Sequence, residues 1–336
     1  MHEQEFTYTG TRFFPIQSSV LDERALLSQV VGDYCIPEPE SCRFLDRGDA
    51  DVYRVKTAAG HFYLKAYRPP QSLERTEAEA SFVWALSTSG IPVVKPVRRI
   101  DGSFACRVTA PEGVRTMLLF EQAPPALPSR LDEELLSRIG ERVASVHSAA
   151  DEFDTDFGVP ELDVKSCLQE QVFHSSQFLS NLESAYLRDV ASHLESFLER
   201  QSRQLPEFGL CHGDLVISNV RLGTEGTIVL FDFGNAMKTW RTLELAIVHW
   251  SLRSRTQDNQ EGLWKAFLRG YESIRSLPGT LPESLAGMLV LRQLCFLGGN
   301  CATLPLRLGT QLLESGFVGE QMQRLRQFVE ESGILI

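Results

Sequence analysis

The sequence lacks the Cys-x-x-Cys pairs that mark zinc sites and redox motifs, although it contains seven cysteines. Their number is odd and they are scattered along the chain, so they indicate neither a disulfide framework nor a zinc site. We therefore expect free thiols in a reducing compartment. Cys211, which lies beside the central motif of the chain, is best interpreted as a small buried hydrophobic residue.

Basic residues are also scarce, because 33 lysines and arginines face 44 acidic residues and the net charge is −11. A chain without basic excess cannot neutralise many phosphates, so we expect neither nucleic acid nor an anionic membrane as a partner. An acidic surface tolerates a cationic substrate, but it is also an ordinary means of keeping a protein soluble.

A long hydrophobic run is missing as well. Residues 1–6 show neither the basic start nor the apolar stretch of a signal peptide. The longest apolar stretch, residues 288–297, is interrupted by Arg292 and Gln293 and is too short to span a bilayer. We therefore expect a cytoplasmic protein. Its 336 residues suffice for one large domain or for two lobes that share a cleft.

The most informative part of the chain is a polar loop with Asp214 and Asn219, followed by a predicted β-hairpin. Its strands are expected over residues 219–222 and 228–231, on either side of a glycine-containing turn. The hairpin would bring Asp232 back beside Asn219. An amide oxygen and a carboxylate suit Mg²⁺, which prefers oxygen ligands. Asp214 projects from the same loop and can face an incoming hydroxyl group.

Phosphoryl transfer needs an aspartate that orients the nucleophile, oxygen ligands for Mg²⁺ and a lysine on the phosphates. The run His-Gly-Asp-x4-Asn from His212 to Asn219, followed by Asp-Phe-Gly from Asp232, resembles the catalytic core of the aminoglycoside phosphotransferase and choline kinase superfamily. This superfamily is the small-molecule branch of the protein-kinase fold, and Gly213 stands where protein kinases carry an arginine. A chance polar loop before a hairpin is the alternative, but two motifs in order are more specific than one. The resemblance implies Asp214 as the catalytic residue, Asn219 and Asp232 as metal ligands, and ATP with Mg²⁺ as cofactors.

The resemblance also implies an α+β, bilobal, protein-kinase-like fold. Residues 1–121 would form a nucleotide-binding lobe with a five-stranded antiparallel sheet and one main helix. Residues 122–336 would form a mostly helical lobe for catalysis and substrate binding. The β-rich segments within residues 42–67 and 97–120 agree with the sheet, and we expect a hairpin over residues 97–108.

Lys65 is the candidate for the phosphate-binding lysine. It lies on a predicted strand where Tyr63 and Tyr67 share its face. A lysine is unusual on a strand that is otherwise suited to burial, because an isolated buried ammonium group is costly. An exposed edge strand is the alternative, whereas the resemblance places Lys65 on the α- and β-phosphates.

The predicted helix over residues 72–89 offers three carboxylates as partners of Lys65: Glu74, Glu77 and Glu79. Glu79 shares the apolar face of this helix with Phe82. We therefore choose Glu79 as the partner of Lys65, with Glu77 second.

Three further residues are assigned to the nucleotide through the resemblance. Gly48 lies in the loop of residues 47–51, where the kinase fold places its nucleotide-covering loop, although this loop departs from Gly-x-Gly-x-x-Gly. The backbone groups of Glu121 and Ala123 would bind the adenine edge in the hinge between the lobes.

Two histidines and one glutamate are interpreted as structural. His147 is more readily a satisfied core histidine than a catalytic one, since the site already has its base. His212 is expected to pack the loop and to hydrogen-bond the backbone, because Mg²⁺ prefers oxygen over imidazole. Glu244 stands where the superfamily has an aspartate that supports the backbone of the catalytic loop.

We expect an ATP-dependent phosphotransferase that acts on a hydroxyl group of a small molecule. The chain between Asp232 and Glu244 is too short for the activation segment of a protein kinase, which favours a small substrate. Aminoglycosides, choline-like amines, hydroxylated amino acids and sugars are all candidates, and helices within residues 163–203 are expected on the substrate side. The sequence gives no indication of the oligomeric state.

Two alternatives remain. A Ser/Thr protein kinase of the bacterial stress-response type resembles the chain in layout, including the run Lys-Ala-Tyr-Arg-Pro that begins at Lys65. A non-catalytic nucleotide-binding regulator is the second, but a dead kinase commonly lacks at least one of the residues that this chain retains.

Overall fold

The computed structural model describes residues 16–125, 130–255, 259–279 and 281–334. By internal contacts the chain divides into two compact units. The first contains Met1–Thr76 and Val97–Phe120, and the second contains Glu77–Pro96 and Glu121–Ile336. The division of nucleotide binding and catalysis between the two predicted lobes stays a prediction.

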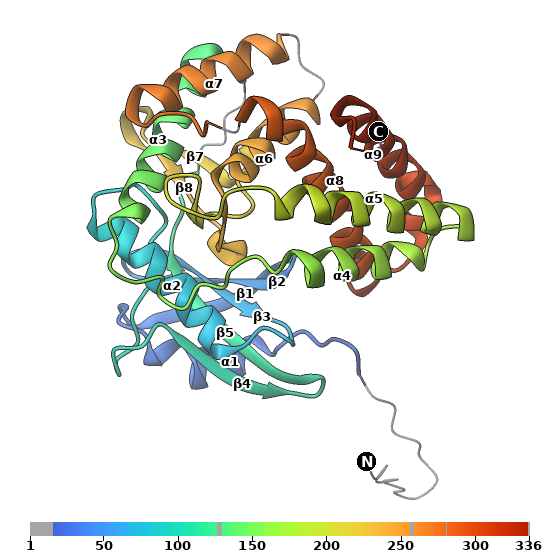
Figure 1. Cartoon of the computed structure of the whole chain (residues 1–336). Helices are drawn as coiled ribbons and strands as arrows, with labels where there is room; N and C mark the ends of the chain where they lie inside the picture. Colours follow the sequence, from blue (N-terminus) through green and yellow to red (C-terminus); the bar gives the residue numbers. More distant parts are fainter. Residues whose placement is uncertain (1–15, 126–129, 256–258, 280, 335–336) are drawn as a thin grey trace, which may run out of the picture. The chain divides into compact units, whose positions relative to one another are not determined.

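The first unit contains a five-stranded sheet with the order β1-β2-β3-β5-β4 (Figure 1). The pairs β1–β2, β2–β3 and β4–β5 are antiparallel. The strands are β1 (Pro39–Arg47), β2 (Ala50–Thr57), β3 (Gly60–Tyr67), β4 (Ala105–Ala110) and β5 (Gly113–Glu121). Alternation along β2 buries Tyr53 and Val55 in an apolar core that also includes Leu26 of α1 (Glu23–Gln29). The 3-10 turn η1 (Val31–Asp33) follows α1.

The predicted hairpin over residues 97–108 is wrong. β4 begins only at Ala105 and pairs with β5. The N–H of Val97 instead donates to the Leu119 carbonyl at 2.7 Å, and the N–H of Ile100 donates to the Asp33 carbonyl at 2.8 Å. These donors are held by distant segments, so they cannot pair with the strand that follows.

The second unit is mostly helical (Figure 1). Its helices are α2 (Leu73–Thr88), whose first turn belongs to the first unit, α3 (Glu133–Asp151), α4 (Val164–Ser176), α5 (Asn181–Glu199), α6 (Arg241–Arg253), α7 (Gln260–Ile274), α8 (Leu281–Leu308) and α9 (Val318–Ser332). A π-helical turn, η5 (Leu313–Phe317), precedes α9. Side-chain oxygens cap several starts, and each such cap stabilises a helix by about 1 kcal/mol. The capping residues are Asp132, Asp163 and Ser180.

Two short two-stranded sheets accompany these helices. One pairs β6 (Phe208–Cys211) with β9 (Met237–Trp240), and the other pairs β7 (Val220–Leu222) with β8 (Ile228–Leu230). The apolar core of the β7–β8 hairpin also includes side chains from α2, α3 and α7. The chain therefore places its predicted metal ligands on a well-packed support.

Helices α3 and α7 cross at two glycines. A Cβ on Gly140 would lie 2.1 Å from the Phe267 carbonyl oxygen, and a Cβ on Gly270 would lie 1.8 Å from that of Ser137. Both helices therefore require glycine at this crossing, where backbone meets backbone.

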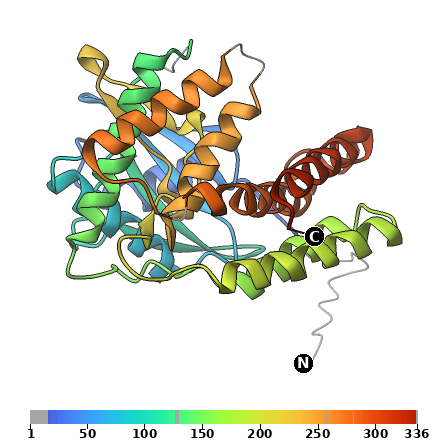
Figure 2. The same cartoon turned by 45° about the horizontal axis from the view of Figure 1, so that its top comes forward.

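A second core joins α4 and α5 to α8 and α9 (Figure 2, green and red). The Sγ atoms of Cys167 on α4 and Cys295 on α8 lie 3.7 Å apart, as free thiols. The segment Glu283–Arg307 of α8 is the one described helix that is long and apolar enough to cross a membrane by length and composition. This differs from the sequence interpretation, which considered only a shorter apolar run. Since 56% of its candidate window is buried inside the protein, a core helix passes the same test.

Candidate active site

The β7–β8 hairpin forms as predicted and returns the chain to the polar loop. A 3-10 turn, η2 (Ile217–Asn219), leads into β7. The N–H of Phe231 donates to the Asn219 carbonyl oxygen at 3.2 Å. Asp232 therefore follows directly on a residue that is bonded to the predicted metal ligand Asn219.

His212 makes the second connection between the loop and the end of the hairpin. Its Nδ1 lies 3.3 Å from the Asp214 N–H nitrogen, and its Nε2 lies 2.9 Å from the Phe231 carbonyl oxygen. We assign the neutral tautomer with the proton on Nε2, because Nδ1 must accept and Nε2 must donate. The ring also packs on Phe233, with 4.3 Å between the ring centroids. The structural interpretation of His212 is confirmed.

The two predicted metal ligands differ in how they are held. Asn219 is buried, and its Nδ2 donates to the Asp214 carbonyl oxygen at 2.9 Å, which leaves its Oδ1 as the group that a metal can bind. Asp232 is exposed and has φ 69° and ψ 57°, a left-handed conformation that is uncommon for a residue other than glycine. Such backbone conformations concentrate at functional sites. An amide oxygen and a carboxylate from neighbouring turns fit a magnesium ion.

Gly213 allows the loop to approach the segment after Asp232. Its φ is +79°, and a Cβ at this position would lie 2.0 Å from the Asn235 carbonyl oxygen in the 3-10 turn η4 (Phe233–Asn235). An arginine, as in protein kinases, has no room here. The glycine is therefore a requirement of this loop conformation.

Glu244 of α6 supports the loop backbone, as predicted from its position. Its Oε2 accepts the His212 N–H at 2.6 Å and the Gly213 N–H at 3.5 Å. Burial acts to raise the pKa of this carboxyl group, but the contacts with His147 and His212 outweigh it and hold the pKa below its usual range. Glu244 is therefore an ionised, buried acceptor for the catalytic loop.

His147 on α3 is fully buried beside Glu244. Its Nδ1 lies 2.9 Å from the Tyr271 hydroxyl oxygen, and its Nε2 lies 3.7 Å from Glu244 Oε2. Burial and the charge of Arg241 lower the pKa of His147 to about 4. The ring is therefore neutral at pH 7, in agreement with a structural role.

This histidine makes the stability of the fold depend on pH. The unfolded chain binds a proton on His147 near pH 6.5, whereas the folded chain does so only near pH 4, so stability falls as the pH drops through this window. Between pH 7 and pH 5 we expect a loss of about 2 kcal/mol from this group. Urea unfolding at the two pH values should show a smaller loss for His147→Gln than for the wild type. Equal losses in both proteins would contradict the assignment.

A second cluster of possible metal ligands includes Glu244, which supports the loop. The ligand atoms of His147, Cys211 and Glu244 lie within 4.8 Å of one another, and all three residues are buried. The Nη1 of Arg241 lies 3.4 Å from Cys211 Sγ, and Nη2 of the same residue pairs with Asp151 Oδ1 at 2.6 Å. A buried guanidinium beside the sulfur opposes a second cation, so we assign this cluster to the support of the loop.

Arg292 of α8 is the residue at the site that the sequence analysis missed. Its Nη2 lies 2.8 Å from Asp214 Oδ1. In the sequence, Arg292 stands out only as an interruption of an apolar run. The apolar run around Arg292 was the signal that could have identified it. An arginine within an otherwise buried helix requires an acidic partner.

Lys65 and Glu79 are two of the residues predicted to bind the nucleotide. Each lies in the local environment that was predicted from the sequence. Lys65 of β3 is half-buried, with its Nζ 5.8 Å from the ring centroid of Tyr67 and 5.5 Å from that of Phe120. Glu79 is fully buried on the apolar face of α2 that also carries Phe82. An ion pair between Lys65 and Glu79 would join the two units and stays a prediction.

The predicted adenine-binding residues lie where the chain enters the helical unit for the second time. The N–H of Glu121 already donates to the Lys95 carbonyl oxygen at 2.9 Å, so only its carbonyl oxygen is left for a nucleotide. Ala123 is half-buried and lies just beyond β5. Adenine binding by both residues stays a prediction.

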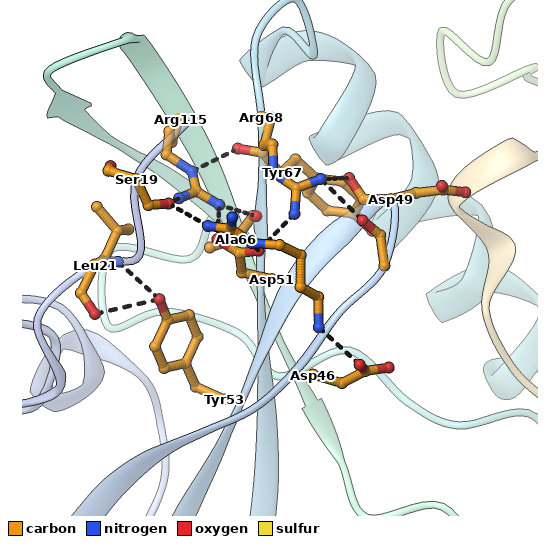
Figure 3. A network of polar contacts seen from close by, with 12 residues as sticks. Ser19, Leu21, Asp46, Asp49, Asp51, Tyr53, Ala66, Tyr67, Arg68 and Arg115 are labelled. Carbon is orange, nitrogen blue, oxygen red and sulfur yellow. Dashed lines mark hydrogen bonds and ion pairs between the residues drawn. The ribbon is translucent and has the colours of Figure 1, made fainter. Parts of the chain in front are cut away.

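The loop with Gly48 is held by a buried ionic network (Figure 3). Arg68 Nη1 donates to the Gly48 carbonyl oxygen at 2.8 Å. The buried carboxylate of Asp51 pairs with Arg68 at 2.6 Å, with Arg115 at 2.8 Å and with Arg47 at 3.2 Å. These pairs fix the loop conformation within the first unit, and a contact between Gly48 and a nucleotide stays a prediction.

Comparison with known proteins shows the family of the chain. The sequence pattern described as the phosphotransferase enzyme family (APH) matches residues 41–280. An uncharacterized protein of Deinococcus radiodurans is 32% identical over 340 residues, which cover 96% of this chain and 95% of that protein. The chain therefore belongs to the phosphotransferase enzyme family.

Solved structures of small-molecule kinases share the fold. An amicoumacin kinase in complex with AMP-PNP and Ca²⁺ aligns with a TM-score of 0.77 at 19% identity, over 91% of this chain and 94% of that one. A microcompartment-associated aminopropanol kinase aligns with a TM-score of 0.76 at 21% identity, over 93% and 99%. The predicted α+β, protein-kinase-like fold is confirmed.

Proposed function

We propose that this chain is a kinase that uses ATP and Mg²⁺ to transfer the γ-phosphate to a hydroxyl group of a small molecule. One observation carries the proposal: His212 and the β7–β8 hairpin join the loop of Asp214 to the residue before Asp232. These contacts support the proposal, because phosphoryl transfer requires oxygen-bearing groups from separate segments to lie near one another.

Each residue of the site has a proposed role. Asn219 and Asp232 would hold Mg²⁺, which supplies neutralisation of the phosphate charge when bound. Asp214 orients the acceptor hydroxyl and takes its proton as the new P–O bond forms and the bond to the leaving ADP breaks. Five residues would bind the nucleotide through side chain or backbone: Lys65, Glu79, Gly48, Glu121 and Ala123.

The similar structures support a small acceptor. The amicoumacin kinase was determined with a nucleotide analogue and a divalent cation, and the other protein is an aminopropanol kinase. In this chain, η4, β9 and the start of α6 take up all residues between Asp232 and Glu244 except Ala236. No segment is left there for docking a peptide, which favours a small molecule over a protein substrate. A cytoplasmic location belongs to the same proposal.

The test is a screen for ADP release with amines, amino acids, sugars and antibiotics that carry a hydroxyl group. We expect Mg²⁺-dependent ADP release with at least one of them, and loss of the signal with EDTA. With γ-labelled ATP the label should appear on the small molecule. Label on protein alone would favour the Ser/Thr protein kinase, and no ATP consumption with any compound would favour the non-catalytic regulator.

A further inference from the structure

Arg292 stands next to the carboxylate that faces the acceptor. It extends from α8, a mostly apolar helix in which Leu291 and Leu294 are buried. Its Nη2 pairs with Asp214 Oδ1 at 2.8 Å, and its side chain is only 14% exposed. A guanidinium that is always charged therefore borders the place where the hydroxyl group of the substrate would bind.

The position of this guanidinium is fixed by Trp250 of α6. Its Cζ lies 4.8 Å from the centroid of the Trp250 ring. The indole Nε1 donates to the Oε1 of Gln293 at 2.7 Å, so the ring itself is held by the residue next to Arg292. The cationic group is thus preorganised and does not need to be ordered by a ligand.

The guanidinium also has a hydrogen-bond donor that is not used. Its Nε is buried and has no hydrogen-bond partner among the residues that the structure describes. Arginine presents its donors in a planar fork that matches a carboxylate with two parallel hydrogen bonds, and Nη2 is the nitrogen that lies 2.8 Å from Asp214 Oδ1. An anion of the substrate can therefore share this guanidinium with Asp214.

We propose that the acceptor carries a carboxylate group near its hydroxyl group, and that Arg292 binds this carboxylate while Asp214 faces the hydroxyl. The substrate class is then a hydroxylated carboxylic acid of the hydroxy-amino-acid type. A substrate with only an ammonium group near its hydroxyl would place a cation against Arg292, which is unfavourable. The inference rests on the proposed function and makes Arg292 a specificity-determining residue.

The experiment uses pairs of acceptors that differ only by the carboxylate: L-threonine with 1-amino-2-propanol, L-homoserine with 3-amino-1-propanol, and L-serine with ethanolamine. The kcat/KM of an acid should exceed that of its decarboxylated counterpart by at least about tenfold, as one charge-assisted hydrogen bond allows. In Arg292→Gln this preference should fall to about one, mainly through KM. Arg292→Lys, which keeps the charge, should retain part of it.

The matched control is Arg324→Gln. Arg324 of α9 also lies against Trp250, at 4.7 Å from the ring centroid, and its Nη2 bonds to the Ser254 hydroxyl. This variant should leave the preference unchanged. If Arg292→Gln lowers kcat equally for both members of a pair, Arg292 only positions Asp214 and the inference is wrong.

The experiment distinguishes failure of the inference from failure of the proposed function. If amino alcohols are phosphorylated and no acid is preferred, the inference is overturned while the kinase stands. If no member of any pair accepts phosphate, the inference is also overturned, and the proposed function then depends on the wider ADP-release screen.

Discussion

Replacing Asp214 by asparagine is expected to lower kcat by about 10²–10⁴-fold, because the amide cannot accept the proton of the acceptor hydroxyl. The side chain keeps its shape, and neither Asn219 nor Asp232 is changed. Nucleotide affinity should therefore stay within about threefold of the wild-type value, since a transition-state contact is lost without a ground-state one. The two quantities are measured by initial rates and by titration calorimetry with a non-hydrolysable ATP analogue.

Asp189→Asn serves as the matched control for this variant. Asp189 lies on α5 with 61% of its side chain exposed, and its removal should leave kcat unchanged. Turnover by Asp214→Asn at a level close to that of Asp189→Asn would show that Asp214 is not the catalytic residue.

Replacing Glu244 by alanine is expected to weaken both the fold and the reaction. Glu244 Oε2 accepts two backbone N–H groups of the catalytic loop, at 2.6 Å and 3.5 Å, in a buried environment. Hydrogen bonds to a charged group stabilise by roughly 1.5–3 kcal/mol, so we expect a loss of about 3 kcal/mol in the free energy of unfolding. Displacement of the loop by even about 1 Å can lower kcat about 10²-fold. Urea unfolding and initial rates measure the two effects.

Glu244→Gln separates the support of the loop from general damage to the fold. The amide oxygen of glutamine can still accept the His212 N–H, so both losses should be smaller than with alanine. The KM for ATP should change little in either variant, because Glu244 is predicted to act through the loop alone. A kcat that is unaffected in folded Glu244→Ala would contradict the assigned role.

The parts of the site that the sequence predicted correctly depend on local patterns. Gly223 and Gly226 between two short apolar runs predict the hairpin, and the hairpin alone decides that Asp232 returns to Asn219. The apolar face of α2 predicts that Glu79 is buried. The support of the loop by Glu244 was implied by the resemblance to the superfamily, which has an aspartate at this place.

The parts that the sequence did not predict depend on contacts between distant segments. Arg292 meets Asp214 only because α8 packs against the helix that follows the catalytic loop, and no local pattern encodes that packing. For the same reason, the N–H of Val97 donates to the Leu119 carbonyl oxygen and not to the strand that follows it in the sequence. Gly140 and Gly270 are visible in the sequence. That the crossing of α3 and α7 requires glycine at these two positions is seen only in the structure.

The central claim is that Asn219 and Asp232 hold the metal of a bound nucleotide. It is tested most directly by electron paramagnetic resonance of Mn²⁺, titrated into the protein with a non-hydrolysable ATP analogue. The account predicts one protein-bound Mn²⁺ per nucleotide in the wild type and an affinity at least about tenfold weaker in Asp232→Asn. Binding of Mn²⁺ by Asp232→Asn with the affinity of the wild type would contradict it.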